Sequence, residues 1–238
     1  MLPKSLQIIS APNDRWPSMA AAIINQAVRK SLFESSFCNL MLTGGNTAKR
    51  LYEEWSATSS LPIDQIHFFF GDERCVSPKS DDSNFSLVMK SLFLNRLSSG
   101  AVINRMEGEN PNRRAAAKKY EELLPKQIDV LILGMGLDGH IASLPPGHHA
   151  LKERELSVLA ITDLVELKYD RITITPKVIG EAKNVFLLAT GVEKGKLLAK
   201  IIASPIDFQA LPIQLTYSGT WLLDEDAERE ILNYHNCG

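Results

Sequence analysis

The sequence of 238 residues lacks the features that mark several large classes of protein. It has only three cysteines, Cys38, Cys75 and Cys237, and this odd, widely spaced set excludes a disulfide framework and a cysteine-based zinc site. No apolar run approaches the roughly 18 residues of a membrane span. The first residues, Met1–Ser5, have no signal-peptide apolar core or cleavage site. We therefore expect a cytoplasmic protein.

An excess of charge of one sign is also missing. Lys and Arg total 26 against 28 Asp and Glu, which gives a formal net charge of −2. Strong general binding of nucleic acid or of an acidic membrane needs a positive excess, so neither is an expected partner, and any anion must be held by a local cluster. With 45% hydrophobic and 23% charged residues and no linker or repeat, residues 1–238 are expected to form a single domain.

What the chain does contain is an alternation of short apolar runs with longer amphipathic stretches. Most of the apolar runs lack polar alternation, which is typical of parallel strands buried on both faces. The sequence therefore predicts an α/β fold with a doubly wound, mainly parallel sheet flanked by helices on both faces, and antiparallel strands within 156–174. The expected strands are Leu6–Ile9, Leu40–Leu42, Ile66–Phe70, Ala101–Asn104, Val130–Leu133, Leu156–Ile161, Arg171–Ile174, Val185–Ala189 and Trp221–Leu223. The expected helices are Trp16–Phe33, Thr47–Trp55, Asn84–Phe93, one capped by Asn110 and running to Leu124, a short one from Pro176, Val192–Ile202 and one at the C-terminus.

Ligands of such folds bind beyond the carboxyl ends of the strands, so the loops there are the candidate sites. The first is Thr43-Gly44-Gly45-Asn46-Thr47. Its glycines and the following helix N-terminus suit a phosphate, although a plain strand-to-helix turn explains them equally well. No Gly-Lys-Ser/Thr follows, which excludes a nucleotide-binding P-loop.

The second candidate is Gly71-Asp72-Glu73-Arg74, which follows the expected strand Ile66–Phe70. Charged side chains at the end of a buried strand must be paired, and a surface turn with an internal ion pair is as good an explanation as a functional site. Asp82-Ser83-Asn84 shortly afterwards predicts a helix cap, with a polar ligand contact as the alternative.

The third loop, Gly134 to Ser143, contains the pattern G-x-G-x-x-G after a strand. A dinucleotide site needs a long helix at these glycines, and Pro145-Pro146-Gly147 prevents one. The loop holds Asp138 and His140 at a strand end, where the histidine is a candidate general base or merely an exposed side chain.

Other candidates are weaker. Lys194 opens a late helix and Arg171 begins a strand, so either side chain could reach an anion. His148 and His149 have no metal-ligand spacing, and no Gly-x-Ser-x-Gly nucleophile motif is present.

Taken together and in order, these loops resemble the 6-phosphogluconolactonase family, within the group that includes glucosamine-6-phosphate isomerase/deaminase. The resemblance extends from Leu40 to Leu223. The segments that carry it are Gly71 to Val76, Asp82 to Asn84, Leu133 to His140, Arg171 to Thr175 and Gly191 to Lys194.

The resemblance implies hydrolysis of 6-phospho-D-glucono-1,5-lactone to 6-phosphogluconate, in the oxidative pentose phosphate pathway, with no metal or organic cofactor. It implies that His140 activates water, with Asp138 orienting it and Asp72 and Arg74 lining the same site. It implies further that the loop Gly44, Gly45, Asn46 and Thr47, with Lys194 and Arg171, holds the phosphate, and that Asn84 contacts the sugar ring. The sugar-phosphate lactone is then the only expected partner, and a monomer is compatible with the sequence.

Two alternatives remain. The isomerase/deaminase relatives also have His-Ile-Ala but continue with Phe-Asn-Glu-Pro, whose glutamate assists ring opening; here the chain continues Ser143-Leu144-Pro145, without a carboxylate. A non-catalytic sugar-phosphate-binding module is the other alternative, and binding without turnover would indicate it.

Overall fold

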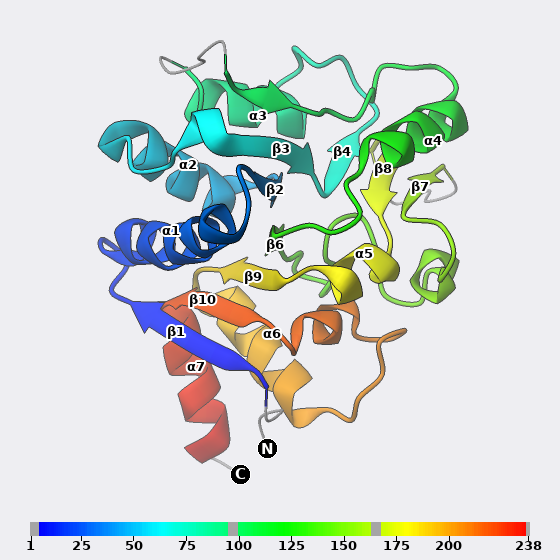
Figure 1. The fold of residues 1–238 in the computed structure, drawn as a ribbon. Helices are drawn as coiled ribbons and strands as arrows, with labels where there is room; N and C mark the ends of the chain where they lie inside the picture. The colour runs from blue at the N-terminus through cyan, green and yellow to red at the C-terminus, as the bar shows by residue number, and fades with distance from the viewer. Residues whose placement is uncertain (1–4, 95–99, 163–167, 237–238) are drawn as a thin grey trace.

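The computed structural model describes residues 5–94, 100–162 and 168–236, so that Cys237 and the first four residues lie outside it. Its centre is a seven-stranded sheet in which every neighbouring pair is parallel (Figure 1). Its strands are, in spatial order, β1 (Gln7–Ala11), β10 (Thr220–Asp224), β9 (Asn184–Ala189), β6 (Val130–Gly134), β2 (Cys38–Leu42), β3 (Ile66–Phe70) and β5 (Val102–Ile103). The predicted doubly wound, mainly parallel sheet is confirmed.

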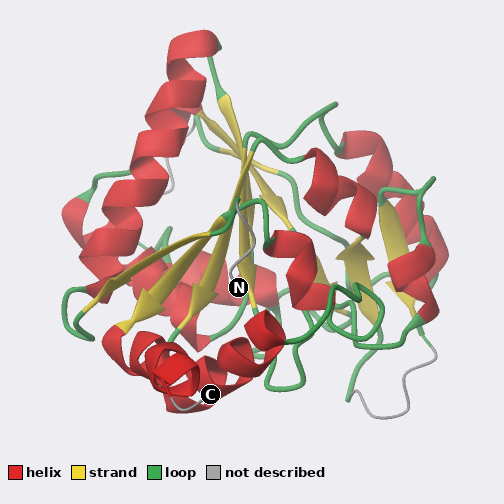
Figure 2. Ribbon diagram, turned by 90° about the horizontal axis from the view of Figure 1, so that it is seen from below, coloured by secondary structure: helices red, strands yellow, loops and turns green. Residues whose placement is uncertain are grey.

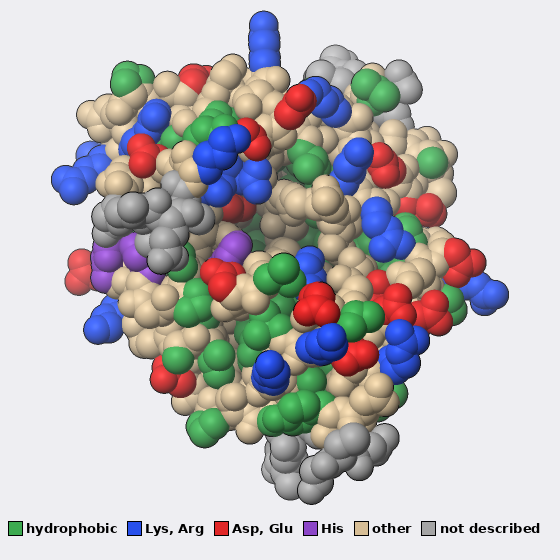
Figure 3. Space-filling model, turned by 180° about the vertical axis from the view of Figure 1, so that it is seen from behind, with side chains coloured by type: hydrophobic (Ala, Val, Ile, Leu, Met, Phe, Trp, Pro, Cys, Tyr) green, Lys and Arg blue, Asp and Glu red, His purple; other side chains and the backbone are tan. Residues whose placement is uncertain are grey.

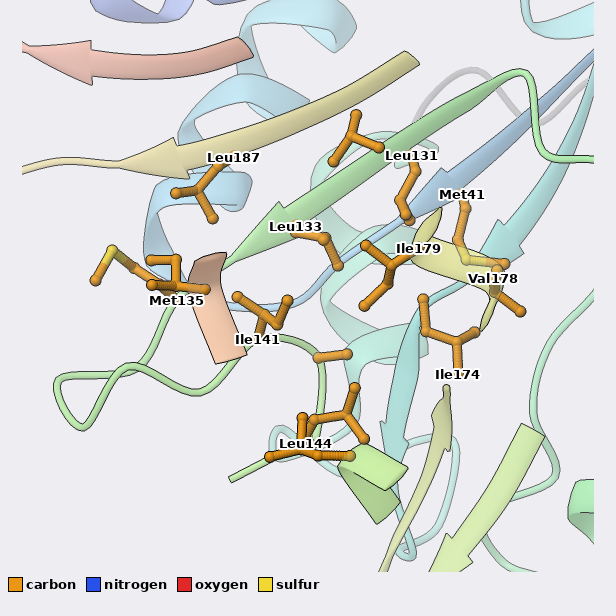
Figure 4. Packing of buried hydrophobic residues seen from close by; sticks show 14 of the residues in the cluster. Met41, Leu131, Leu133, Met135, Ile141, Leu144, Ile174, Val178, Ile179 and Leu187 are labelled. Atoms are coloured by element: carbon orange, nitrogen blue, oxygen red, sulfur yellow. The ribbon is translucent and has the colours of Figure 1, made fainter. Parts of the chain in front are cut away.

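Helices cover both faces of this sheet because its strands are apolar on both sides (Figure 2). Along β2, for example, Leu40 and Leu42 belong to one buried cluster and Met41 to the other. One face is covered by α1 (Trp16–Glu34), α2 (Asn46–Thr58) and α3 (Asn84–Ser91). The other is covered by α4 (Arg113–Leu123), α5 (Pro176–Glu181), α6 (Val192–Ala203) and α7 (Glu225–Asn236), and Figure 4 shows part of its apolar packing. The described part of the chain also contains three 3₁₀ turns, at Ile63–Gln65, His149–Lys152 and Pro212–Thr216.

A small antiparallel sheet lies beside the large one. It pairs β4 (Asp72–Arg74) with β8 (Arg171–Ile174), and β8 with β7 (Val158–Ile161). The antiparallel strands expected within 156–174 are therefore present, and β4 joins them from a segment not predicted as a strand. The expectation of one domain over residues 1–238 stays a prediction.

Two buried tyrosines hold the strand ends from which the site loops leave. The Tyr52 hydroxyl donates to the Thr43 carbonyl at 2.7 Å and accepts from the Thr43 amide at 3.1 Å. Tyr120 does the same for Phe70, at 3.0 and 2.7 Å. The backbone groups that leave the ladder at these points thus keep hydrogen-bond partners.

The predicted start of helix α4 was wrong. The Asn112 side chain, not that of Asn110, accepts from the Ala115 amide and caps α4. The Asn110 side chain instead accepts from the Asn112 amide, an Asx turn that leaves Pro111 ahead of the helix. Among the described residues, no helix is long and apolar enough to cross a membrane.

Candidate active site

A cleft of about 170 Å³ opens at the carboxyl edge of the large sheet. It lies at the loops that follow β2 and β6, neighbouring strands from which the chain continues in opposite directions along the sheet. This is the topological switch point where doubly wound folds bind ligands. Figure 3 shows that face hollowed near its middle, with basic, acidic and histidine side chains at the border. The lining residues are Thr43, Gly44, Gly45, Asn46, Thr47, Asp72, Arg74, Asn84, Gly134, Met135, His140, Ala142 and Lys194.

On the β6 side of the cleft, His140 and Asp138 form a hydrogen-bonded pair. His140 Nδ1 lies 2.7 Å from Asp138 Oδ1, which also accepts the His140 amide at 3.1 Å. The bond from His140 lowers the pKa of Asp138, so this carboxylate stays charged and orients the ring. A Cβ on Gly136 would lie 2.3 Å from the His140 ring, so the ring packs where only glycine leaves room.

Asp72 lies buried at the start of β4. Its Oδ1 accepts from Asn84 Nδ2 at 3.0 Å and its Oδ2 accepts from Ser143 Oγ at 2.6 Å. Asn84 Nδ2 also donates to the Asp72 carbonyl at 2.9 Å, and a Cβ on Gly44 would lie only 1.9 Å from Asn84 Oδ1. The Asp72 carboxylate is therefore bound by the start of α3 and by the loop after β6, and the glycine loop after β2 packs against Asn84 beside it.

Glu73 faces away from the cleft and holds the start of α3. Its carboxylate accepts the Arg74, Asn84 and Phe85 amides and the Ser83 hydroxyl, at 2.7 to 2.9 Å. Burial raises the pKa of Glu73 in spite of these donors. The sequence predicted that the charged side chains after β3 must be paired. The partners of the Glu73 carboxylate are backbone amides and a hydroxyl, rather than a cation as in the expected ion pair. The helix cap predicted from Asp82-Ser83-Asn84 is present, and Ser83 is the residue that caps α3.

Arg74 lines the cleft, and Arg171 stands opposite it in the β4–β8 ladder. Arg74 donates from one terminal nitrogen to the Asp82 carbonyl at 2.6 Å. Burial and the nearby Arg74 charge both lower the pKa of Arg171. The Nε atoms of both arginines are buried without a hydrogen-bond partner among the described residues. Arg171 is not among the described cleft-lining residues, so its phosphate contact stays a prediction.

The glycine loop after β2 forms the opposite wall. Gly45 has a φ of 93°, which L residues avoid. As the N-cap of α2 it has no side chain to cap the helix, so within the described residues no N-cap side chain occupies the first-turn amides. Lys194 Nζ lies 3.3 Å from Thr47 Oγ1, which is 3.0 Å from Thr190 Oγ1. Burial lowers the pKa of Lys194. A cation and helix-start amides thus share one wall.

The structure brings most of the predicted site residues into one cleft, although it does not test their roles. Two of them are not among the described cleft-lining residues: Asp138, which is hydrogen-bonded to the lining residue His140, and Arg171, which lies opposite the lining residue Arg74 in the β4–β8 ladder. Sequence reasoning missed Ser143, whose partner Asp72 is 71 residues away in the chain. Among the described residues, no group of three or more His, Cys, Asp or Glu side chains is arranged to hold a metal ion.

Comparisons with known proteins find relatives along most of the chain. Residues 13–222 match the family model described as glucosamine-6-phosphate isomerases/6-phosphogluconolactonase. A 6-phosphogluconolactonase of Nostoc sp. is 37% identical over 206 residues, which cover 81% of this chain and 84% of that protein. One from Haemophilus influenzae is 34% identical over 203 residues, covering 80% and 86%.

Solved structures show the same likeness. The 6-phosphogluconolactonase of Thermotoga maritima superposes with a TM-score of 0.79 at 27% identity, covering 92% of this chain and all of that one. A monomeric glucosamine-6-phosphate deaminase has the same TM-score of 0.79 at 20% identity, covering 94% and 99%, and at that identity it shares the fold alone.

Proposed function

The chain belongs to the glucosamine-6-phosphate isomerase/6-phosphogluconolactonase family, and on that premise we propose that it hydrolyses 6-phospho-D-glucono-1,5-lactone to 6-phosphogluconate. The observation that carries the mechanism is the His140–Asp138 pair, which borders the same cleft as the glycine loop and Lys194. One wall has a base and the other has donors for an anion. Hydrolysis of a phosphorylated lactone requires both: a base to activate water and donors to bind the phosphate.

The phosphate is held by the wall that follows β2. It carries about two negative charges, whereas the chain as a whole is slightly acidic. The attraction must therefore be local, and the amides at the start of α2, the Thr47 hydroxyl and the Lys194 ammonium supply it. Arg171, opposite Arg74 in the β4–β8 ladder, adds positive charge near the cleft.

Water is activated by His140. Because Nδ1 faces Asp138, the imidazole presents Nε2 as the base. Nε2 takes a proton as the water oxygen bonds to C1 of the lactone, and the carbonyl oxygen becomes an oxyanion. The C1–O5 bond then breaks, the imidazolium returns its proton to O5, and the product is an acid with a free 5-hydroxyl.

Asp72, Asn84 and Arg74 position the ring. Asp72 is held by two donors and serves as an acceptor for a lactone hydroxyl, with Asn84 beside it. Arg74 is the cation in the cleft on this side, and its guanidinium stabilises the oxyanion. A lactone is an activated ester, so a base and an oxyanion donor suffice without a covalent intermediate.

The test is lactone turnover. Fresh 6-phosphogluconolactone is made by glucose-6-phosphate dehydrogenase, and its loss is followed above the spontaneous rate. We expect rapid loss with the wild type and a kcat lowered by on the order of 10²- to 10⁴-fold in His140→Ala. His67→Ala is the matched control, because His67 stacks on Phe37 outside the cleft-lining set.

Each failure has its own meaning. Near-normal turnover by His140→Ala would refute the base assignment alone. A wild type that leaves the lactone at its background rate would refute the proposed function. Turnover of glucosamine 6-phosphate by such a protein would then establish the deaminase alternative, and tight sugar-phosphate binding without turnover would establish a binding module.

A cytoplasmic location is part of the same proposal, and a monomer is compatible with it. Cys38 and Cys75 are buried free thiols, which suits a reducing compartment. Burial raises the pKa of both, of Cys75 to about 11, which keeps these thiols protonated and unreactive. Light scattering on the purified chain gives the oligomeric state directly.

A further inference from the structure

One side chain, Ser143, joins the loop that carries His140 to the strand that carries Asp72. Ser143 is buried, three residues beyond His140, and its Oγ donates to Asp72 Oδ2 at 2.6 Å. That distance lies in the short range of hydroxyl–carboxylate bonds, which are stronger than neutral ones. The contact spans two elements that are far apart in the chain.

The backbone around Ser143 is built to point this hydroxyl. A tight turn is closed by the Leu144 amide, which donates to the Ile141 carbonyl at 3.0 Å. Within it Ala142 has a φ of 48°, in the left-handed region that L residues other than glycine seldom adopt. Such strain persists only where surrounding contacts enforce it, and it is concentrated at functional sites.

The small sheet provides those contacts. The Ser143 amide donates to Thr173 Oγ1 at 3.1 Å. Thr173 is fully buried and is the partner of Asp72 in the β4–β8 ladder. The amide of Ser143 is therefore bound to Thr173, and its hydroxyl is bound to Asp72, the residue opposite Thr173 in the ladder.

The effect on Asp72 follows from its second donor. Asn84 Nδ2 binds Oδ1 while Ser143 Oγ binds Oδ2, so rotation of the carboxylate would break both bonds. Because each Asp72 oxygen accepts one hydrogen bond from the protein, the carboxylate keeps one orientation, and its remaining lone pairs point in a fixed direction. In a buried site this fixes Asp72 as an acceptor.

We propose that Ser143 is a positioning residue for lactone hydrolysis, setting the direction of the Asp72 carboxylate and the placement of the His140 loop relative to it. This inference rests on the proposed lactonase function. Asp72 then accepts a substrate hydroxyl, and the proton from water passes to His140.

The test is a double-mutant cycle with lactone turnover. In Ser143→Ala we expect kcat to fall roughly 10- to 100-fold, the loss of one hydrogen bond to a charged group. The KM should change less than about twofold, because the phosphate wall is untouched. Ser143→Thr keeps the hydroxyl and should recover most of kcat. In an Asp72→Asn background, Ser143→Ala should lower kcat less than about threefold further.

Ser91→Ala is the matched control, because Ser91 is a buried serine whose hydroxyl donates to the Leu87 carbonyl in α3. Circular dichroism shows whether each variant is folded. If Ser143→Ala is not, Ser143→Cys, with a weak donor of similar size, takes its place with the same expected split. An inactive wild type refutes the lactonase function itself. With an active wild type, unchanged kcat in Ser143→Ala, or an undiminished effect in the Asp72→Asn background, overturns the positioning role.

Discussion

Adding a single methyl group to Gly44 should disturb the site through one identifiable neighbour. The Cβ of an alanine would lie 1.9 Å from Asn84 Oδ1, 2.5 Å from Cγ and 3.0 Å from Nδ2. Ordinary contacts begin near 3.4 Å, so the Asn84 amide must withdraw by about 1.5 Å. That movement breaks its bonds to the carbonyl and the carboxylate of Asp72.

The size of the effect follows from those two bonds. At about 1–2 kcal/mol each, their loss should lower the free energy of unfolding of Gly44→Ala by about 2–4 kcal/mol. A displacement of this order at a reacting site lowers turnover about 10²-fold, so kcat/KM for the lactone should fall by that factor. Urea unfolding measures the first quantity, and lactone turnover measures the second.

Two comparisons isolate the cause. Gly180→Ala adds a methyl to an exposed glycine of α5, where the new Cβ would meet no described atom within 4 Å beyond its own helix and chain neighbours. It should leave the free energy of unfolding unchanged or slightly raised. In an Asn84→Ala background the three clashing atoms are gone, so Gly44→Ala should cost less than about 1 kcal/mol. A full loss of stability in that background would refute the steric argument.

Two further predictions concern charge and backbone strain. Lys194→Ala should raise the KM for the lactone with little change in kcat, because the lysine holds the phosphate equally in the ground and transition states. In the wild type, binding of 6-phosphogluconate measured by calorimetry should weaken as pH rises, because the Lys194 ammonium that attracts the phosphate loses its proton. Burial lowers the pKa of Lys194, so this loss should begin below the pH at which a solvent lysine titrates; Lys194→Arg should remove it, and pH-independent binding by the wild type would contradict the role. Ala142→Gly should leave the free energy of unfolding unchanged or raise it by up to about 1 kcal/mol, since relief of the left-handed strain offsets the greater freedom of glycine. Ala22→Gly on the exposed face of α1 should lower it by about 1 kcal/mol in the same thermal unfolding assay, and equal losses in both variants would contradict the strain.

Much of the fold was predictable because its strands are uniformly apolar. The bounds of β3 and β8 agree with the prediction to the residue, and the cleft opens at the strand ends where a doubly wound fold places it. Local patterns decide these features. The start of α4 was missed because two asparagines two residues apart both suit a cap, and only the Asx turn at Asn110 chooses between them.

The rest of the site depends on contacts between distant segments. Ser143 contacts Asp72 only when the small sheet forms beside β6, and no residue spacing in the sequence predicts this contact. The direction of Arg171 depends likewise on the register of β4 against β8, which places it opposite Arg74. Periodicity predicts that such residues lie on strands, but not which side chains meet across two sheets.

The edge strand β1 of the large sheet has a consequence for synthesis of the chain. Among the described strands, β1 hydrogen-bonds only to β10 in this sheet, with Gln7 opposite Thr220. At about 5–20 residues per second, a ribosome needs roughly 10–40 s to make the residues between them. During that interval β1 has no native partner in the large sheet, because β10 has not yet been made.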